Sequence, residues 1–337
     1  MSVGSVREKS RSEAQGIRYG FYDRLTAKFP SQVIIDTTEF CNLACIHCPH
    51  PAFKESVHYS GSSLDPELNA KVVDEVREHG KRLTQYIRYT GSGETTIHPH
   101  FYEMLAYATK HSGVLVTVTT NGVSMKKSRI EKMLDAGVAF VDISIDAFSP
   151  ETYAKIRVNG DLNVTRANVL KLIAMSKERG SKTKVVVSYV EQPQNRHETK
   201  DFERYWKDHG AEHVVIRRLH SAAGAVINTA QIMRRENSTV ERRPCLYPWE
   251  RIVVTPRGFL SFCPADWSHG ATVIDYRTTT ILETWQGEFY EKLRNAHLSN
   301  DFSKHGFCGQ CPDWRATRWP GEGLSYANMV ERFKELE

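Results

Sequence analysis

The sequence lacks the features that would place the protein in or across a membrane. None of its 337 residues belongs to an apolar run of the about 18–20 residues that a spanning helix requires. The N-terminal stretch, MSVGSVREKSRSEAQG, is polar and has no apolar signal-peptide core. Charge of one sign is not in excess either, because the net charge is +5 and acidic and basic residues are interleaved. We therefore expect a cytoplasmic protein with neither a membrane nor a nucleic acid as partner.

Disorder and a disulfide framework are also disfavoured. The chain is 40% hydrophobic and 25% charged, which is ordinary for a globular protein. It has seven cysteines, an odd number that cannot all pair. Because the cytoplasm is reducing, these cysteines are better interpreted as metal ligands or catalytic groups.

From residue 33 to about residue 220, short β-branched runs alternate with amphipathic helical segments. The expected strands cover residues 33–37, 86–90, 114–119, 140–146, 184–189 and 214–217. The expected helices cover residues 65–79, 99–110, 128–136, 164–179 and 198–209. Asp65-Pro66 is a helix-start signal, and Gly80, Gly137 and Gly180 follow expected helix ends.

This rhythm predicts an α/β fold with a parallel sheet and right-handed crossovers. Periodicity alone leaves open whether the sheet is doubly wound or an incomplete barrel. In both cases the active site belongs at the carboxyl ends of the strands.

The alternation of expected strands and helices ends after the last expected strand, near residue 220. We predict a lead-in over residues 1–30, a main α/β domain over 31–220, a connection over 221–243 and a small α+β module over 244–337. Within the module we expect a hairpin around residues 256–258 and a helix near 282–297.

The first group of cysteines follows the first expected strand. Cys41, Cys45 and Cys48 have the spacing C-x3-C-x2-C. Three thiolates can bind three irons of a cubane cluster and leave the fourth iron open, which is typical of a catalytic centre. The alternative is a structural cluster, or a zinc knuckle in which His47 or His50 supplies the fourth ligand.

This pattern resembles the signature of the radical S-adenosylmethionine (radical SAM) superfamily, with His47 at the variable ring position. The resemblance implies a partial (β/α)6 barrel, a SAM-binding 4Fe–4S cluster and SAM itself as cofactors. It further implies that the amine and carboxylate of SAM bind the open iron. One electron then cleaves SAM to methionine and a 5′-deoxyadenosyl radical, which abstracts a hydrogen atom from the substrate.

The same resemblance assigns further residues to SAM. Gly91-Ser92-Gly93-Glu94 is similar to a glycine-rich, acid-ended motif that holds the methionine amine, with Ser92 where the family usually has glycine. The turn that contains Asn121 resembles a recurrent turn near SAM, Ser144 and Asp146 resemble a ribose-contacting pair, and Arg157 resembles an arginine that meets the SAM carboxylate. Taken singly, each could serve only a turn, a helix cap or a solvated helix face. The complete set is Ser92, Gly93, Glu94, Asn121, Ser144, Asp146 and Arg157.

The second group is Cys245, Cys263, Cys308 and Cys311. Four thiolates match full ligation of a second 4Fe–4S cluster, although a four-cysteine zinc site has the same ligand count. The segment resembles the SPASM/Twitch module of radical SAM enzymes, which favours iron. Since no cysteine follows Cys311, the resemblance is to the shorter Twitch form with one auxiliary cluster, in a layout similar to that of aminocyclitol dehydrogenases.

The cysteine count bears on the reaction. All seven are assigned to clusters, so no thiol remains to return a hydrogen atom to a substrate radical. A fully ligated auxiliary cluster can accept an electron, which suits oxidation of a carbinol in a small sugar- or aminocyclitol-like molecule. Arg217 and His220, at the end of the sixth expected strand, are candidates for the catalytic base.

Other reactions remain open. An epimerase, decarboxylase or dehydratase of a sugar or nucleoside uses the same radical, as does a ribosomal-peptide maturase. About 32 residues precede the first strand, too few for a peptide-recognition domain, so we expect a small-molecule substrate, with a short peptide as the alternative. An external one-electron donor such as flavodoxin or ferredoxin is implied. The non-enzymatic alternative is an iron–sulfur or zinc protein with a structural or electron-transfer role.

Overall fold

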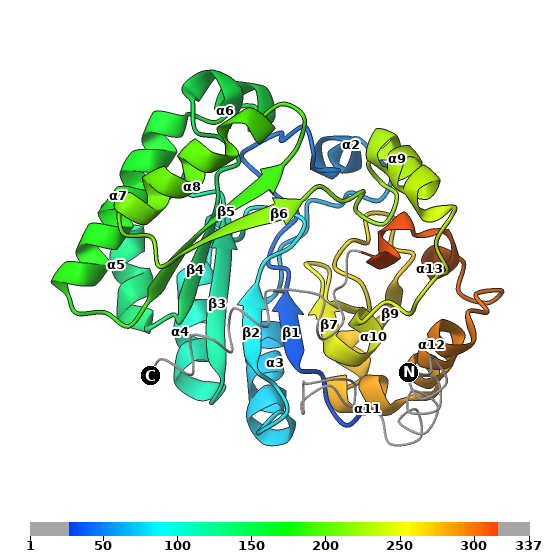
Figure 1. Cartoon of the computed structure of the whole chain (residues 1–337). Coiled ribbons are helices and arrows are strands. Elements are labelled where there is room, and N and C mark those ends of the chain that lie inside the picture. Colours follow the sequence, from blue (N-terminus) through cyan, green and yellow to red (C-terminus); the bar gives the residue numbers. More distant parts are fainter. Residues whose placement is uncertain (1–26, 316–337) are drawn as a thin grey trace, which may run out of the picture.

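The computed structural model describes residues 27–315 and is built on a parallel sheet. Six parallel strands alternate with helices, as predicted from the sequence (Figure 1). The strands are β1 (Gln32–Ile35), β2 (Tyr86–Tyr89), β3 (Leu115–Thr120), β4 (Phe140–Ser144), β5 (Lys184–Glu191) and β6 (His213–Arg218). The helices that follow them are α3 (Pro66–His79), α4 (Phe101–His111), α5 (Lys127–Ala136), α6 (Pro150–Ile156), α7 (Leu162–Glu178) and α8 (Thr199–Asp208).

The strand order decides between the two sheet types. The strands lie side by side in sequence order, from β1 to β6. A doubly wound sheet would reverse direction at a switch point, and none occurs between β1 and β6. The sheet is therefore the partial barrel that the resemblance implied, with its helices on the outside.

Local signals set several helix boundaries. The Asp65 side chain accepts a hydrogen bond from the Glu67 N–H at 2.8 Å and so caps α3. Gly137 ends α5 with a left-handed φ of 72°. Strand β4 stops at Ser144, two residues earlier than expected, and Asp146 then has a φ of 63° that no strand tolerates.

Two expectations for the C-terminal half were incomplete. The predicted connection contains a helix, α9 (Ile227–Asn237), whose exposed face has no clear hydrophobic stripe to identify it. The expected single helix near residue 282 is two, α11 (Ile281–Gln286) and α12 (Glu288–Ser299). They are separated by Gly287, which has an extended ψ of 166°.

The barrel sheet continues into the C-terminal segment. Strand β7 (Arg251–Val254) pairs in parallel with β1, and it forms the expected hairpin with β8 (Phe259–Ser261). Strand β9 (Thr272–Asp275) completes the sheet as its outer strand. The remaining elements of this segment are α10 (Tyr247–Glu250), α13 (Gly306–Gln310) and the short 3-10 helices η3 (Tyr276–Thr278) and η4 (Pro312–Arg315).

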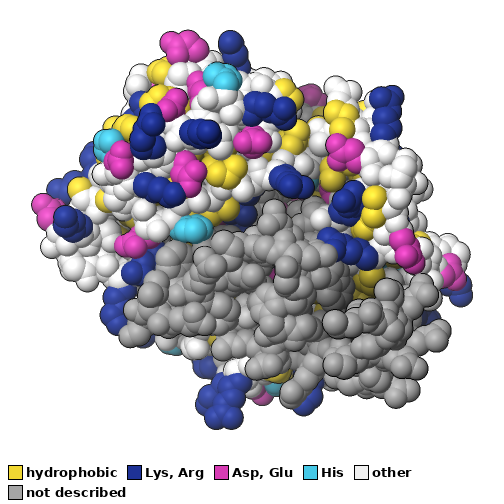
Figure 2. Space-filling view, in the orientation of Figure 1, with side chains coloured by type: hydrophobic (Ala, Val, Ile, Leu, Met, Phe, Trp, Pro, Cys, Tyr) yellow, Lys and Arg dark blue, Asp and Glu magenta, His cyan; other side chains and the backbone are white. Residues whose placement is uncertain are grey.

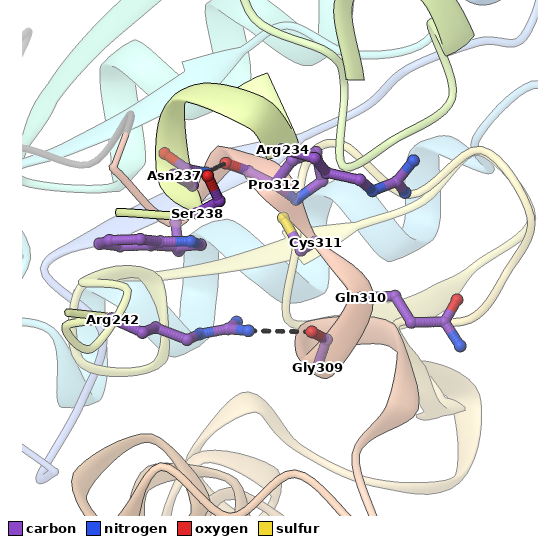
Figure 3. A pocket seen from close by; sticks show the side chains of 9 residues that line it. Arg234, Asn237, Ser238, Arg242, Gly309, Gln310, Cys311 and Pro312 are labelled. Carbon is purple, nitrogen blue, oxygen red and sulfur yellow. Dashed lines mark hydrogen bonds between the residues drawn. The ribbon is translucent and has the colours of Figure 1, made fainter. Parts of the chain in front are cut away.

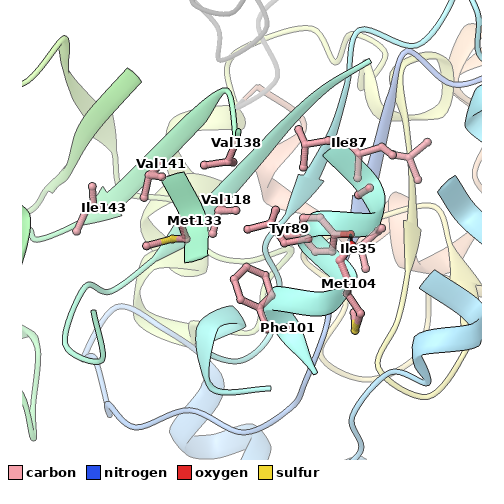
Figure 4. Close-up of a cluster of buried hydrophobic side chains, with 14 of the residues drawn as sticks. Ile35, Ile87, Tyr89, Phe101, Met104, Val118, Met133, Val138, Val141 and Ile143 are labelled. Carbon is pink, nitrogen blue, oxygen red and sulfur yellow. Dashed lines mark hydrogen bonds between the residues drawn. The ribbon is translucent and has the colours of Figure 1, made fainter. Parts of the chain in front are cut away.

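The main core lies between the sheet and its outer helices. Alternate residues of each strand point outward, and Figure 4 shows Ile87 and Tyr89 of β2 and Val118 of β3 packed with Phe101 and Met104 of α4. These side chains are at most 2% exposed. The opposite face of the same strands lines the barrel interior and carries the polar residues described below.

The described surface is mixed in charge. Over the coloured part of the face in Figure 2, basic and acidic side chains are scattered among one another, in agreement with their interleaving along the chain. Among residues 27–315, no helix has both the length and the apolarity needed to span a bilayer.

Candidate functional site

The first three cysteines lie together in the loop between β1 and α2 (His50–Lys54). Two backbone hydrogen bonds of 3.0 Å join the N–H groups of Ala44 and Ile46 to carbonyls at the end of α6 and just beyond it. The Cys48 N–H also donates to the Cys45 carbonyl at 3.1 Å. Backbone hydrogen bonds therefore fix the conformation of the loop, and its thiols are not needed for that and can act as metal ligands.

The surroundings of these thiols suit a bound cation. Burial raises the pKa of Cys41 to about 11 and that of Cys48 to about 12. Burial also raises the pKa of Cys45, against the nearby Arg157 guanidinium, which lowers it. Without added positive charge the three thiols stay protonated, and a cluster of irons would supply that charge.

A site for a single metal ion, such as the zinc knuckle considered above, would need its ligands to converge on one point. In the part of the chain that the structure describes, no three His, Cys, Asp or Glu side chains are placed to hold a single metal ion. A cubane instead takes one thiolate on each of several irons. His50, a proposed zinc ligand, has its Nε2 within 2.8 Å of the Glu39 carbonyl oxygen.

The glycine-rich loop after β2 packs against the backbone of the cysteine loop. A Cβ atom on Gly93 would lie 2.2 Å from the Phe40 carbonyl oxygen and 2.3 Å from that of Thr38. The Glu94 N–H donates to the same Phe40 carbonyl at 2.8 Å. Only glycine allows this approach, so the two loops form one surface.

Glu94 ties the ends of β2 and β3 together. Its Oε1 accepts the Thr96 and Thr120 hydroxyls at 2.6 Å, and its Oε2 accepts the Asn121 N–H at 2.8 Å. The Asn121 side-chain amide in turn donates to Asn42 Oδ1 in the cysteine loop at 2.8 Å. Since the Glu94 carboxylate is buried and occupied, it shapes the loop, and the neighbouring backbone is what a ligand would meet.

Asp36, one residue after β1, was not predicted as a site residue. Its Oδ2 accepts the N–H of Ser92 at 2.8 Å and the Ser92 hydroxyl at 2.7 Å. Burial raises its pKa to about 7, although the Ser92 bonds lower it. The sequence feature that could have identified Asp36 is a carboxylate directly after an apolar strand. Its hydrogen bonds with Ser92 explain why serine is tolerated where glycine is usual.

Asp146 and Arg157 form a buried ion pair beside the cysteines. Arg157 donates to Asp146 Oδ2 from two of its nitrogens, Nε at 2.8 Å and Nη2. Arg157 Nη1 also lies 3.6 Å from Cys45 Sγ, and His47 Nε2 lies 3.4 Å from Asp146 Oδ2. Asp146 Oδ1 accepts the Val190 N–H at 2.7 Å. The pair thus links the cysteine loop to the ends of β4 and β5.

Burial lowers the pKa of both bases of this cluster, but their net pKa shifts have opposite signs. Burial alone lowers the pKa of Arg157, but the Asp146 carboxylate raises it overall. Burial lowers the pKa of His47 to about 4, against Asp146, so the ring is neutral at pH 7. Ser144, by contrast, is half-buried, and its hydroxyl has no partner among the described residues.

The barrel interior holds a charged layer that the sequence analysis missed. Asp142 of β4 accepts from Arg88 of β2 at 3.3 Å and from Arg217 of β6 at 2.9 Å. The Ser188 hydroxyl of β5 donates to its other oxygen. The sequence feature that could have revealed this layer is a charged residue within each strand. Such residues can pair with one another where their side chains point into the barrel.

The structure places the two predicted catalytic residues close to this layer. Arg217 is paired with Asp142, and a guanidinium in such a pair stays protonated and cannot act as a base. His220 lies just beyond β6, and its Nδ1 accepts the Ala222 N–H at 3.1 Å. Both side chains are thus arranged as donors, which suits holding a substrate oxygen.

The four C-terminal cysteines come together from segments before α10, after β8 and around α13. Burial raises the pKa of Cys263, Cys308 and Cys311, and each of these is raised further by the charge of Cys245. Arg242 donates to the Cys308 carbonyl at 2.5 Å and to the Gly309 carbonyl at 2.9 Å. Four neighbouring thiols beside one guanidinium fit a fully ligated cluster.

A pocket of about 520 Å³ opens beside Cys311. Figure 3 shows Arg234 and Asn237 of α9 on one side of it and Arg242 and Gln310 on the other. Asn237 Nδ2 donates to the Pro312 carbonyl at 2.7 Å. The helix that the sequence analysis missed therefore helps to hold the last cysteine pair.

Comparisons with known proteins agree with this geometry. Residues 35–205 match the family model of the Radical SAM superfamily, and residues 245–312 match that of SPASM, an iron-sulfur cluster-binding domain. Mycofactocin maturase MftC of Mycobacterium ulcerans (strain Agy99) is 26% identical over 214 residues, which are 64% of this chain and 53% of the relative. The chain thus spans about half the length of that relative.

Two solved structures share the fold. The crystal structure of BtrN in complex with AdoMet and 2-DOIA matches with a TM-score of 0.59 and 16% identity, over 84% of this chain and 93% of that one. Streptococcus suis SuiB bound to precursor peptide SuiA matches with a TM-score of 0.63 and 15% identity, over 97% of this chain and 77% of that one. The chain belongs to the radical SAM superfamily, with a SAM-binding 4Fe–4S cluster and an iron–sulfur SPASM segment.

Proposed function

We propose that the chain oxidises a carbinol of a small sugar- or aminocyclitol-like molecule in the cytoplasm. When bound, the SAM-ligated cluster supplies a 5′-deoxyadenosyl radical and the auxiliary cluster supplies a one-electron acceptor. The carbinol loses one hydrogen atom, one proton and one electron in total and becomes a carbonyl. The observation that carries this proposal is that all seven cysteines, buried or partly buried, fall into two groups, so no thiol is left to return a hydrogen atom.

The proposed cluster ligands are Cys41, Cys45 and Cys48 for the SAM-binding cluster and Cys245, Cys263, Cys308 and Cys311 for the auxiliary cluster. The proposed SAM-binding residues are Ser92, Gly93, Glu94, Asn121, Ser144, Asp146 and Arg157. We further propose a barrel domain over residues 31–220, a connection over 221–243 and the auxiliary module over 244–337, with flavodoxin or ferredoxin as electron donor. The predicted lead-in over residues 1–30 lies largely outside the described residues, as does the end of the module.

Within this proposal the chain's own residues bind and orient. The backbone around Gly93 is held by Glu94 and Asp36, and it forms a rigid edge for the methionine end of SAM. The half-buried Ser144 hydroxyl is available to a ribose. Asp146 is occupied by Arg157 and the Val190 N–H, so it would reach a ribose only by exchanging a partner.

Maturation of a peptide is the second candidate. It is favoured by the similarity to mycofactocin maturase MftC and by the shared fold with SuiB, whose structure holds the precursor peptide SuiA. Both candidates use the same radical, so the products must separate them.

The product and its isotopes test the redox outcome. The reconstituted protein, SAM and dithionite would be incubated in D2O with a panel of aminocyclitols and sugars, and products analysed by mass spectrometry. We expect a carbonyl product that has lost two hydrogens, formed in equal amount to 5′-deoxyadenosine. A product of unchanged oxidation state that carries deuterium at the reacting carbon would contradict oxidation and favour epimerisation.

Replacing Gly93 with alanine is expected to weaken SAM binding by about 5- to 150-fold, because the new methyl group must push two loops apart at a cost of about 1–3 kcal/mol. Anaerobic calorimetric titration with SAM measures this loss. Gly306→Ala is the matched control, since a Cβ there meets nothing within 4 Å. Parent-like SAM affinity in Gly93→Ala would show that the loop does not form the SAM edge.

A further inference from the structure

The chain makes an unusual turn as it leaves β6. Ala222 and Ala223 have left-handed φ values of 51° and 57°, and Gly224 follows with 108°. Two successive alanines in this region are costly, since each non-glycine residue there loses about 1–2 kcal/mol. Such a conformation persists only where other contacts enforce it.

Those contacts come from a residue 90 positions further along the chain. Asp313, two residues after Cys311, accepts the Ser221 N–H and hydroxyl at 2.9 Å each and the Ala223 N–H at 2.6 Å. The left-handed backbone turns these N–H groups toward one carboxylate, as in other anion-binding turns. The loop of the last cysteine pair therefore shapes the turn after β6.

The turn in turn fixes the ring of His220. Because Nδ1 accepts the Ala222 N–H at 3.1 Å, the neutral imidazole carries its proton on Nε2. The ring is exposed to solvent, yet desolvation by surrounding protein lowers its pKa. His47 and Arg217 are near enough to His220 for their charges to interact, and both belong to the barrel end.

We propose that Asp313 is a positioning residue, which through the turn at 221–224 fixes the His220 imidazole so that its Nε2–H faces the substrate cavity. This inference rests on the proposed function in one respect, namely that the substrate cavity lies at the carboxyl ends of the strands. It assigns His220 the role of donor to a substrate oxygen. It also makes the loop of Cys308 and Cys311 part of the substrate site, since the Asp313 carboxylate in that loop holds the turn that positions His220.

Chemical modification of His220 tests the proposal on the reconstituted protein. Diethyl pyrocarbonate acylates the unprotonated ring nitrogen, which is Nδ1 here and is protected by its hydrogen bond. Asp313→Asn presents only one acceptor atom to the three donors, so the turn should loosen. We expect the acylation rate of His220, followed by peptide mass spectrometry, to rise about tenfold in this variant.

Asp266→Asn is the matched control. Asp266 lies three residues after Cys263 and accepts the Ser268, Gly270 and Ala271 N–H groups at 2.8–3.1 Å, so it clamps a comparable turn away from His220. Its replacement should leave the His220 rate unchanged. An unchanged rate in Asp313→Asn, or an equal rise in Asp266→Asn, would overturn the proposal.

A milder variant covers the case in which Asp313→Asn does not fold. Ser221→Ala removes one of the three bonds to Asp313 and should raise the acylation rate of His220 about threefold. The absence of a rise would count against the proposal equally.

Dithionite-driven cleavage of SAM, measured on the same samples, reports on the proposed function separately. If the parent protein fails to cleave SAM, the proposed function fails while the His220 comparison still stands.

Discussion

Replacement of Cys45 with alanine is expected to remove one of two clusters and to reduce SAM cleavage to background. With two thiolates left in the loop, one iron of the cubane loses its protein ligand and the cluster is held at two points only. Iron content should fall from about eight to about four atoms per chain. Iron analysis and the formation of 5′-deoxyadenosine under anaerobic conditions measure the two effects.

Cys263→Ala is the matched control for Cys45→Ala. It should remove the other half of the iron, and SAM cleavage without substrate should persist. A Cys45→Ala protein that keeps all its iron would show that the loop is not a cluster site. Zinc at the C-terminal cysteines of the parent would leave the radical chemistry in place and remove the proposed electron acceptor.

Arg157→Met is expected to lower the free energy of unfolding by about 3–5 kcal/mol, because it leaves the fully buried Asp146 carboxylate without its positively charged partner. The side chains of Arg157 and Asp146 are 9% and 0% exposed, so water cannot compensate. Denaturant unfolding of the parent and variant proteins measures the difference. The loss of Arg157 should also disturb the cysteine loop through Cys45.

Two further variants make this prediction specific. Arg204→Met breaks an exposed pair with Asp201, whose side chains are 70% and 46% exposed, and should cost less than about 1 kcal/mol. Adding Asp146→Asn to Arg157→Met should recover part of the stability, since the unpaired charge is then removed. Equal destabilisation by Arg157→Met and Arg204→Met would show that the pair is not effectively buried.

Features encoded within short segments could be predicted from the sequence. The spacing of Cys41, Cys45 and Cys48, the β/α rhythm and the cap at Asp65 all depend on neighbours in the chain. The superfamily and its cofactors followed from these features and are confirmed. The glycine-rich loop was recognised for the same reason.

Features that depend on strand register or on distant segments could not be predicted. The contact of Asp142 with Arg88 and Arg217 requires three strands to be aligned. The hydrogen bond that Ser221 donates to Asp313 joins residues 92 positions apart, and no local pattern specifies it. Helix α9 was missed because its stability comes from contacts with η4 rather than from an apolar face of its own.

The parallel pairing of β7 with β1 has a consequence for how the protein can be divided. In a barrel cut off after β6, β1 would become an open edge strand with unpaired N–H and C=O groups along four residues, from Gln32 to Ile35. Open edges of this kind recruit strands from other copies and lead to aggregation or swapped dimers. The C-terminal segment therefore acts as an edge protector for the barrel, in addition to any redox role, and grafting it onto another enzyme would require a matching β1.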